Sequence, residues 1–451
     1  MLNIFKAIAE NDIESICDII KYNPEVVTKK NCGDMLPLHY AARYNSNIEI
    51  VKLILEAYPQ AAAEEDNKGR FLLHYVARYS IDMNIIKLIF NTHPQAITKV
   101  DNYGMIPLHH AAGFYSDMKV VKFILEAYPK AVYETDDIGK FPLHHVVRRY
   151  NSDMEVVKLI LESYPEAATK KDDNDMFPLH YAARYNTNIE IVKLILDAYP
   201  PAAKEKDDND TYPLHFVVLY NSNIDIVKLI LEAYPEAVLE KDVDGKVPFH
   251  QVAEHNSNIK VVKLILDAYP QAIVEKDNNY MFPIHIAAEC NSNLDVVKLI
   301  LDTYPQAVSK KDRYGRFPLH FAAQNSDIEI VKLILETYPQ ATSEKDIYGM
   351  FPLHHAARQN KNLETIKILY YIYSLAANKM DNLDNLPLCL AERTSSIDVK
   401  NFLKKATDGT LVNAAITLQG AWRECRYNPI YKMCQKIQIE QLMIFYQSNL
   451  I

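Results

Sequence analysis

The chain has 451 residues, and its 49 Lys and Arg against 58 Asp and Glu give a formal net charge of −9. Its hydrophobic content of 49% is too high for a disordered protein, and its negative charge argues against a nucleic-acid partner. Six irregularly spaced cysteines and the lack of 18 consecutive apolar residues predict a cytoplasmic protein, with the nucleus as the alternative, that has no disulfide framework and no membrane span.

Residues 1–30 are interpreted as a truncated repeat at the start of a longer array. The segment Asp12-Ile13-Glu14-Ser15-Ile16-Cys17 matches the pattern of Asn47–Lys52 in the first full repeat. A stack of repeats needs end units that cover its apolar faces. We therefore predict that residues 1–30 form an N-terminal capping repeat.

A Pro-Leu-His motif, or a close variant, recurs through residues 31–405 at intervals of 34 to 36 residues. The motif starts at Pro37, Leu72, Pro107, Pro142, Pro178, Pro213, Pro248, Pro283, Pro318, Pro352 and Pro387. A constant period between about 20 and 50 residues is typical of proteins built from stacked repeats. The sequence therefore predicts eleven tandem repeats in residues 31–405, each covering an apolar face of its neighbour.

Each repeat has the pattern of two helices joined by a turn, as residues 34–68 illustrate. Pro37 suits the first turn of a short helix that carries small apolar side chains on one face. The segment Asn45-Ser46-Asn47 favours a turn, and Ser46 or Asn47 can cap a second helix. That second helix is predicted from Ile48 to Tyr58, because Pro59 disfavours helical geometry in the residue before it.

The residue three positions before each motif predicts a tight hairpin between successive helix pairs. The positions are Asp34, Gly69, Gly104, Gly139, Asp175, Asp210, Gly245, Tyr280, Gly315, Gly349 and Asp384. All but one are Gly or Asp, which accept a positive φ or close an Asx turn most easily. Tyr280 is the exception, and we expect the neighbouring Asn279 to carry the special geometry there.

Pro-Leu-His-Tyr-Ala-Ala at 37–42, followed by Ile-Glu-Ile-Val-Lys-Leu-Ile-Leu at 48–55, resembles the ankyrin repeat. The resemblance implies an all-α fold, an α-solenoid of stacked helix-turn-helix repeats with hairpin-like loops. It also implies a non-enzymatic scaffold that binds a protein partner through its concave groove and finger loops. We expect a monomer without a cofactor. The chain departs from the family by replacing the Thr before each motif with an apolar residue, such as Leu36 or Phe71.

Ten motif histidines raise the question of a metal or catalytic site. They are His39, His74, His109, His144, His180, His215, His250, His285, His320 and His354. Equivalent atoms in adjacent repeats lie on the order of 10 Å apart, too far to share one metal ion. We therefore expect a structural role for them, in hydrogen bonds to the backbone of the neighbouring hairpin. No metal ligand, catalytic residue or enzyme activity is predicted.

The residue after the motif histidine, and the one three positions further on, form the candidate partner-binding face. In the first five repeats the candidate residues are Tyr40, Arg43, Tyr75, Arg78, His110, His145, Arg148, Tyr181 and Arg184, and Gly113 stands at the remaining position. Tyr and Arg are enriched at binding hot spots. We expect the arginines to bind an acidic or phosphorylated partner segment. The alternative is that the aromatic side chains only pack repeat against repeat.

Two positions before each motif, Met alternates imperfectly with polar residues. In the first five repeats these are Met35, Arg70, Met105, Lys140 and Met176. They either form a second partner surface with adaptable Met contacts or record the history of duplication.

Residues 406–451 depart from the repeat and predict a helical C-terminal cap or tail, with helices at 411–421 and 431–446. If the tail binds an effector, the protein is instead a substrate-recruiting adaptor of a ubiquitin-ligase or signalling complex.

Overall fold

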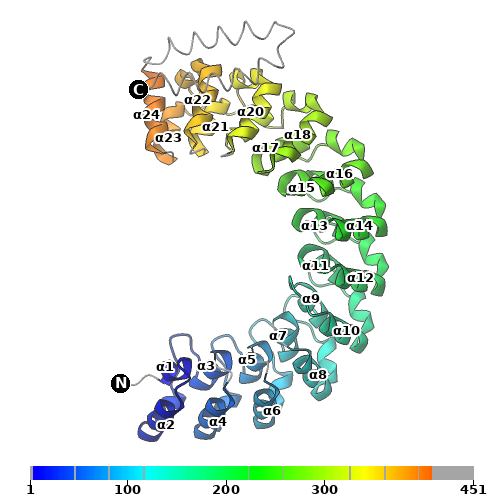
Figure 1. Ribbon diagram of the computed structural model, residues 1–451, viewed down its shortest axis with the longest axis vertical. Coiled ribbons are helices and arrows are strands. Elements are labelled where there is room, and N and C mark those ends of the chain that lie inside the picture. Colours follow the sequence, from blue (N-terminus) through cyan, green and yellow to red (C-terminus); the bar gives the residue numbers. More distant parts are fainter. Residues whose placement is uncertain are drawn as a thin grey trace. The chain divides into compact units, whose positions relative to one another are not determined.

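The computed structural model describes residues 4–408, except 45–46, 80–81, 115–116, 222, 256, 325–326, 360–361 and 395 (Figure 1). The described residues form α-helices, short 3₁₀ helices and turns, with no strand among them. Helices follow one another in pairs, which confirms the predicted all-α fold of helix-turn-helix repeats. The predicted helices at 411–421 and 431–446 lie outside the described residues, and the cap or tail stays a prediction.

The chain divides into two compact units, residues 1–237 and 238–451. The first unit contains the pairs α1 (Ile4–Ala9) and α2 (Ile13–Tyr22), α3 (Pro37–Tyr44) and α4 (Ile48–Ala57), α5 (Leu72–Tyr79) and α6 (Met83–Thr92), α7 (Pro107–Gly113) and α8 (Met118–Ala127), α9 (Pro142–Val147) and α10 (Met154–Ser163), α11 (Pro178–Tyr185) and α12 (Ile189–Ala198), and α13 (Pro213–Tyr220) and α14 (Ile224–Ala233). The pair formed by α1 and α2 precedes the first motif, so residues 1–30 hold two helices of their own.

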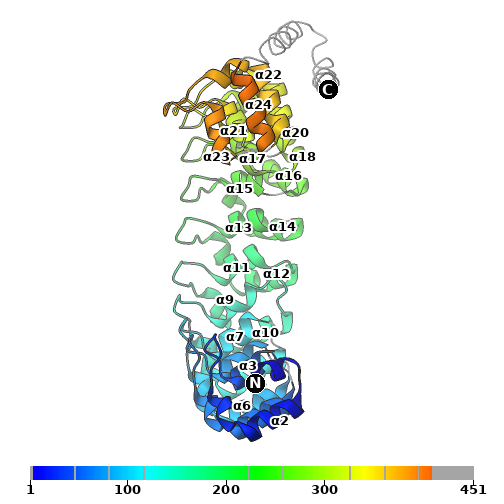
Figure 2. The same ribbon diagram turned by 90° about the vertical axis from the view of Figure 1, so that its left-hand side faces the viewer.

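The second unit contains the pairs α15 (Pro248–His255) and α16 (Ile259–Ala268), α17 (Pro283–Cys290) and α18 (Leu294–Thr303), α19 (Pro318–Ala322) and α20 (Ile328–Thr337), α21 (Pro352–Gln359) and α22 (Leu363–Ile372), and α23 (Pro387–Thr394) and α24 (Ile397–Thr407). In each unit the first helix of a pair packs on the first helix of the next pair, and the second helices pack likewise. Hairpin loops project from one side of these layers (Figure 2).

The ends of the second helices follow from local sequence. Asn47 caps α4 by accepting a hydrogen bond from the Glu49 N–H at 2.9 Å, and Tyr58 follows the last helical residue. Sequence reasoning missed the 3₁₀ turns that follow the second helices, all but the last of which begin at a proline. These turns are η1 (Pro24–Thr28), η2 (Pro59–Ala63), η3 (Pro94–Thr98), η4 (Pro129–Tyr133), η5 (Pro165–Thr169), η6 (Pro200–Lys204), η7 (Pro235–Leu239), η8 (Pro270–Val274), η9 (Pro305–Ser309), η10 (Pro339–Ser343) and η11 (Ser374–Asn378).

The motif histidine joins the start of its helix to the next hairpin. His39 is fully buried, and its Nδ1 accepts a hydrogen bond from the backbone N–H of Leu36 at 3.4 Å. Its Nε2 then donates to the carbonyl of Glu64, 25 residues further on, at 3.2 Å. Burial lowers the pKa of His39 to about 4, so the ring is neutral at pH 7. The imidazole therefore bonds the N–H of residue 36 itself, whereas a threonine side chain at that position would cap an N–H two or three residues further on.

Each hairpin closes around one residue with a positive φ. All eleven predicted positions have this geometry. The first along the chain, Asp34, has a φ of 57°, and the last, Asp384, has a φ of 58°. The expectation for Asn279 was wrong, because Tyr280 itself has a φ of 60°. The N–H of Tyr280 closes the turn on the Asp277 carbonyl at 2.9 Å, whereas Asn279 donates to the Asp277 carboxylate at 2.8 Å. Position in the turn, rather than residue type, sets the conformation.

Candidate functional site

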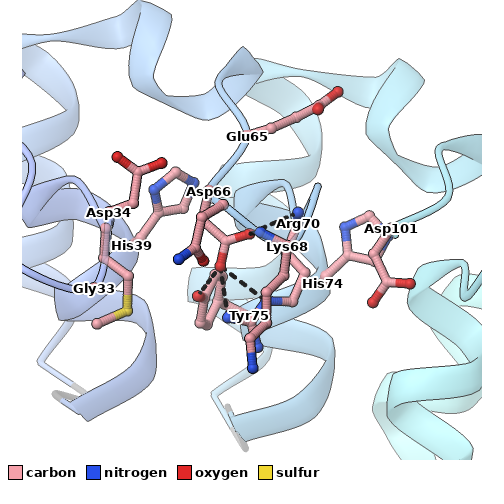
Figure 3. A network of polar contacts seen from close by, with 12 residues as sticks. Gly33, Asp34, His39, Glu65, Asp66, Lys68, Arg70, His74, Tyr75 and Asp101 are labelled. Carbon is pink, nitrogen blue, oxygen red and sulfur yellow. Dashed lines mark hydrogen bonds and ion pairs between the residues drawn. The ribbon is translucent and has the colours of Figure 1, made fainter. Parts of the chain in front are cut away.

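An Asp carboxylate organises each hairpin after the first, where Asn31 takes its place, and Asp66 also fixes its hairpin to the helix that follows. Asp66 accepts hydrogen bonds from the backbone N–H groups of Lys68 and Arg70 at 2.8 and 2.9 Å, which shape the turn. Its second oxygen accepts bonds from the Tyr75 hydroxyl at 2.6 Å and from the Arg70 guanidinium (Figure 3). Burial opposes ionisation of Asp66, but these donors outweigh it and lower its pKa to about 2.

The same contact recurs where the residue after the motif histidine has a polar end. Tyr181 donates to Asp172 at 2.5 Å, and His110 lies 2.9 Å from Asp101. His145 is bonded to Asp136, again at 2.9 Å. In the second unit the equivalent pairs are Gln251 with Asp242 and His355 with Asp346.

These bonds decide how much of the candidate face is accessible. Tyr75, His110 and Tyr181 are buried, with 1%, 2% and 5% exposure, and His145 is half-buried. Tyr40 is half-buried as well and packs edge-on against Phe5, with ring centres 5.4 Å apart. The structure therefore favours the packing interpretation for these five aromatic side chains.

The positions two before each motif are mostly interior. Met35, Lys140 and Met176 are buried, and Met105 is half-buried. Arg70 is held by Asp66, as described above. The exposed hairpin residues lie one or two positions earlier in the sequence, as Tyr103 and Ile138 illustrate.

The four arginines of the candidate face stand at the carboxyl ends of α3, α5, α9 and α11, where each is stacked on aromatic rings. The guanidinium carbon of Arg43 lies 4.9 Å from the ring centre of Tyr44 and 5.6 Å from that of Tyr79 in the next repeat. Arg78 lies 5.1 Å from Tyr79 and 3.3 Å from Phe114, again one repeat further on.

The pattern continues beyond the third repeat. Arg148 lies 5.8 Å from Tyr185 of the next repeat. Arg184 lies 5.0 Å from Tyr185 and 4.4 Å from Tyr220, whose hydroxyl is 3.4 Å from its Nη2. We call this set the arginine–aromatic row; its members are Arg43, Tyr44, Arg78, Tyr79, Phe114, Arg148, Arg184, Tyr185 and Tyr220.

The positive charges of the row have no carboxylate partner among the described residues. Arg148 is exposed, and Arg43, Arg78 and Arg184 are half-buried. Burial lowers the pKa of Arg78, and the charges of Arg70 and Arg43 act in the same direction. The row is thus a set of ordered guanidinium groups that the described part of the chain does not neutralise.

In the second unit, the first two positions equivalent to the row arginines carry the acidic residues Glu254 and Glu289. Glu254 forms an ion pair with Lys246 at 2.9 Å. Burial raises the pKa of Glu289, and repulsion from Glu254 adds to the shift. This sequence of charges differs from that of the first unit, where Arg occupies four of these positions.

Within residues 4–408, apart from the gaps given above, no group of three or more His, Cys, Asp or Glu could hold a metal ion. No helix of that part of the chain is both long and apolar enough to cross a membrane.

Sequence reasoning missed the hairpin carboxylates and the aromatic partners of the arginines. The carboxylates recur three positions before the residue of positive φ in every hairpin except that of Asp34, at Asp66, Asp101, Asp136, Asp172, Asp207, Asp242, Asp277, Asp312, Asp346 and Asp381. The aromatic residues follow the arginines directly, as Tyr44, Tyr79 and Tyr185 do. Both signals are visible once the repeats are aligned with one another.

Comparison with protein families agrees with the geometry. A model of three ankyrin repeats matches residues 4–97, 38–133, 108–207, 187–277 and 249–345. Comparison with curated proteins found no match. The matched segments together cover residues 4–345, more than half of the 451 residues. The helix pairs, the hairpins and this match place the chain in the ankyrin-repeat family.

Proposed function

We propose that the protein is an interaction scaffold whose arginine–aromatic row binds acidic or phosphorylated side chains of a partner protein. Ankyrin repeats generally mediate protein–protein interaction and are typically not enzymes. The observation that carries the proposal is the set of four stacked arginines without a carboxylate partner among the described residues.

Stacking prepares an arginine to bind an anion. The ring contacts use the face of the guanidinium and leave N–H groups along its edge for hydrogen bonds with a carboxylate or phosphate. Because Arg43 and Arg184 already lie against two tyrosines each, they lose less rotamer freedom when a ligand binds. A partly dry site also strengthens each ion pair relative to bulk water.

A purely structural role explains the row less well. Each cation–π contact at an exposed site contributes about 0.5–1 kcal/mol, which would help to hold adjacent repeats together. However, like charges placed on successive repeats repel one another, and an uncharged side chain could pack without that cost. An anionic ligand would remove this repulsion.

The test is a fourfold charge reversal, Arg43→Glu, Arg78→Glu, Arg148→Glu and Arg184→Glu. The matched control places the same charge change on exposed lysines of the second helices, Lys52→Glu, Lys87→Glu, Lys122→Glu and Lys193→Glu. Binding of a fluorescent oligoglutamate peptide is measured by anisotropy after circular dichroism has shown equal helicity. We expect loss of at least about tenfold in affinity in the row variant, well beyond that of the control. Equal losses would mean that only net charge matters, and the proposal would be abandoned.

The adaptor alternative depends on residues 406–451, of which the structure describes 406–408. No contact of the described residues favours it.

A further inference from the structure

We propose that the arginine–aromatic row selects an extended peptide with two pairs of acidic side chains separated by a non-acidic spacer of about five residues. This inference rests on the proposed function and specifies how the acidic side chains are spaced along the ligand. The ligand is thus a segment of a partner protein with a defined charge spacing, rather than any acidic stretch.

The row contains two arginine pairs and one gap. Arg43 and Arg78 belong to adjacent repeats, and so do Arg148 and Arg184. The repeat between the two pairs has Gly113 at the same position, the last residue of α7. The row is therefore positive, positive, neutral, positive, positive along five successive repeats.

The fold does not require a glycine at position 113. Gly113 is not among the residues with a positive φ, so its backbone conformation is open to any residue. A Cβ at this position would lie 3.5 Å from the nearest atoms of His145, which is an ordinary contact distance. An arginine could therefore stand here, and the missing charge is a property of the surface rather than of the architecture.

An apolar ring occupies the gap. Phe114 follows Gly113, and its ring receives Arg78 at 3.3 Å and lies 6.2 Å from the ring of His110. An acidic ligand side chain next to Phe114 would lose hydration without gaining a cation of its own at Gly113. An uncharged or apolar ligand residue fits this position better.

The ligand spacing follows from the distance between protein repeats and the rise per residue of an extended peptide. Equivalent positions in adjacent repeats are on the order of 10 Å apart, and an extended peptide advances about 3.3 Å per residue. About three ligand residues therefore correspond to one repeat. Acidic side chains at roughly positions 1, 4, 10 and 13 of a peptide would meet the four arginines, with about five residues between the pairs.

The gap also favours a peptide over a nucleic-acid strand. A strand carries a phosphate at every nucleotide, so it would bring negative charge to the neutral repeat as well.

The experiment compares peptides of equal length and equal charge that differ in the placement of glutamate. One carries it at about positions 1, 4, 10 and 13, and the others carry four glutamates contiguously or with shorter spacers. A second series replaces glutamate with phosphoserine, which distinguishes carboxylate from phosphate ligands. A single-stranded oligonucleotide is the third probe. All are measured against the full chain by anisotropy, and the spaced peptides should bind at least about tenfold more tightly than the contiguous ones.

Gly113→Arg provides the matched variant, with Gly113→Ala as its control. Filling the gap should abolish the preference for the spacer and strengthen binding of a peptide with an additional acidic residue at the central position. The alanine control should keep the preference of the unmodified protein. Folding of both variants is checked by circular dichroism.

The outcomes separate the two proposals. Equal affinity for all placements, with loss in the fourfold row variant, would overturn the register and leave the proposed function in place. Binding that does not depend on the row arginines would overturn the proposed function itself. Tighter binding of the oligonucleotide than of every peptide would overturn both.

Discussion

The guanidinium of Arg78 lies 3.3 Å from the ring centre of Phe114, a residue of the next repeat. A cation is thus held in place by a ring that belongs to a different helix pair, so the geometry of the charged surface depends on how the repeats stack. Arg43 of the first repeat is held in the same way by the ring of Tyr79 in the second repeat.

Replacing Phe114 with alanine tests whether ring stacking orders the arginine for binding. We expect about a three- to tenfold loss in affinity for an acidic peptide, because Arg78 regains rotamer freedom that binding must then remove. The thermal midpoint should fall only slightly, since a cation–π contact at a partly exposed site contributes about 0.5–1 kcal/mol beyond the ring's own packing. Tyr150→Ala is the control, because Tyr150 is 68% exposed. Unchanged affinity in Phe114→Ala would contradict the ordering role.

Asp66→Asn tests the carboxylate at the base of a hairpin. The substitution removes the charge that accepts bonds from Arg70 and Tyr75, and we expect a loss of about 2–4 kcal/mol of stability at neutral pH. The amide oxygen of the introduced asparagine can still accept the backbone bonds from Lys68 and Arg70, as Asn31 does from Gly33 and Met35, so the loss comes from the side-chain bonds and is measured by denaturant titration at pH 7. The pKa of Asp66 is lowered to about 2, so its stabilisation is present above pH 4 and is lost as the pH falls toward 2. A stability of Asp66→Asn at pH 7 that matches the unmodified protein would contradict this assignment.

The buried motif histidines predict a second, milder acid sensitivity. Burial lowers the pKa of His180 and of His285 to about 4, below the ordinary value of 6.5. The unfolded chain therefore binds protons below pH 6.5 that the folded chain does not, and stability falls from pH 6.5 toward pH 4. Each such histidine contributes at most on the order of 3 kcal/mol to this fall. Denaturant titrations between pH 7 and 4.5 measure it, and a flat profile would refute the neutral buried state.

His285→Gln is expected to reduce the pH dependence while lowering stability at pH 7. Glutamine cannot take up the proton, yet it also cannot reproduce both the bond from the Phe282 N–H at 3.1 Å and the bond to the Lys310 carbonyl at 3.1 Å. Titrations of the variant and the unmodified protein at the same set of pH values provide the comparison.

Tyr280→Gly should stabilise the protein by about 0.5–1 kcal/mol. Tyr280 holds a φ of 60°, which costs about 1 kcal/mol in a residue with a Cβ, and glycine removes that cost. Its side chain is 58% exposed, so little packing is lost. The opposite change, Gly69→Ala, should destabilise, because its Cβ would lie 2.4 Å from the Asn102 side chain. In thermal melts, the unfolding midpoint should rise in Tyr280→Gly and fall in Gly69→Ala. A lower midpoint in Tyr280→Gly would contradict the argument.

The sequence predicted the helix pairs because a proline and a capping Asn or Asp stand at fixed positions in most repeats. Pro37 begins α3 and Asn47 caps α4, and neither depends on contacts distant in sequence. The roles of Tyr75 and Tyr181 could not be derived in the same way. Whether such a side chain faces a ligand or a buried carboxylate depends on how the hairpin folds back onto the helix, which the spacing alone does not determine. The row arginines were found, but their ring contacts cross from one repeat to the next.

The backbone bonds between hairpins have a consequence for how this protein can change over time. The N–H of Asn102 donates to the carbonyl of Lys68, and that of Asp137 to the carbonyl of Tyr103, so each of these hairpins is tied to the one before it. A whole repeat can therefore be gained or lost by duplication or deletion without new junctions having to be invented. If the ligand lies extended along the row, duplication or loss of the neutral repeat would lengthen or shorten the recognised spacer by about three residues, so that related proteins would bind different partners.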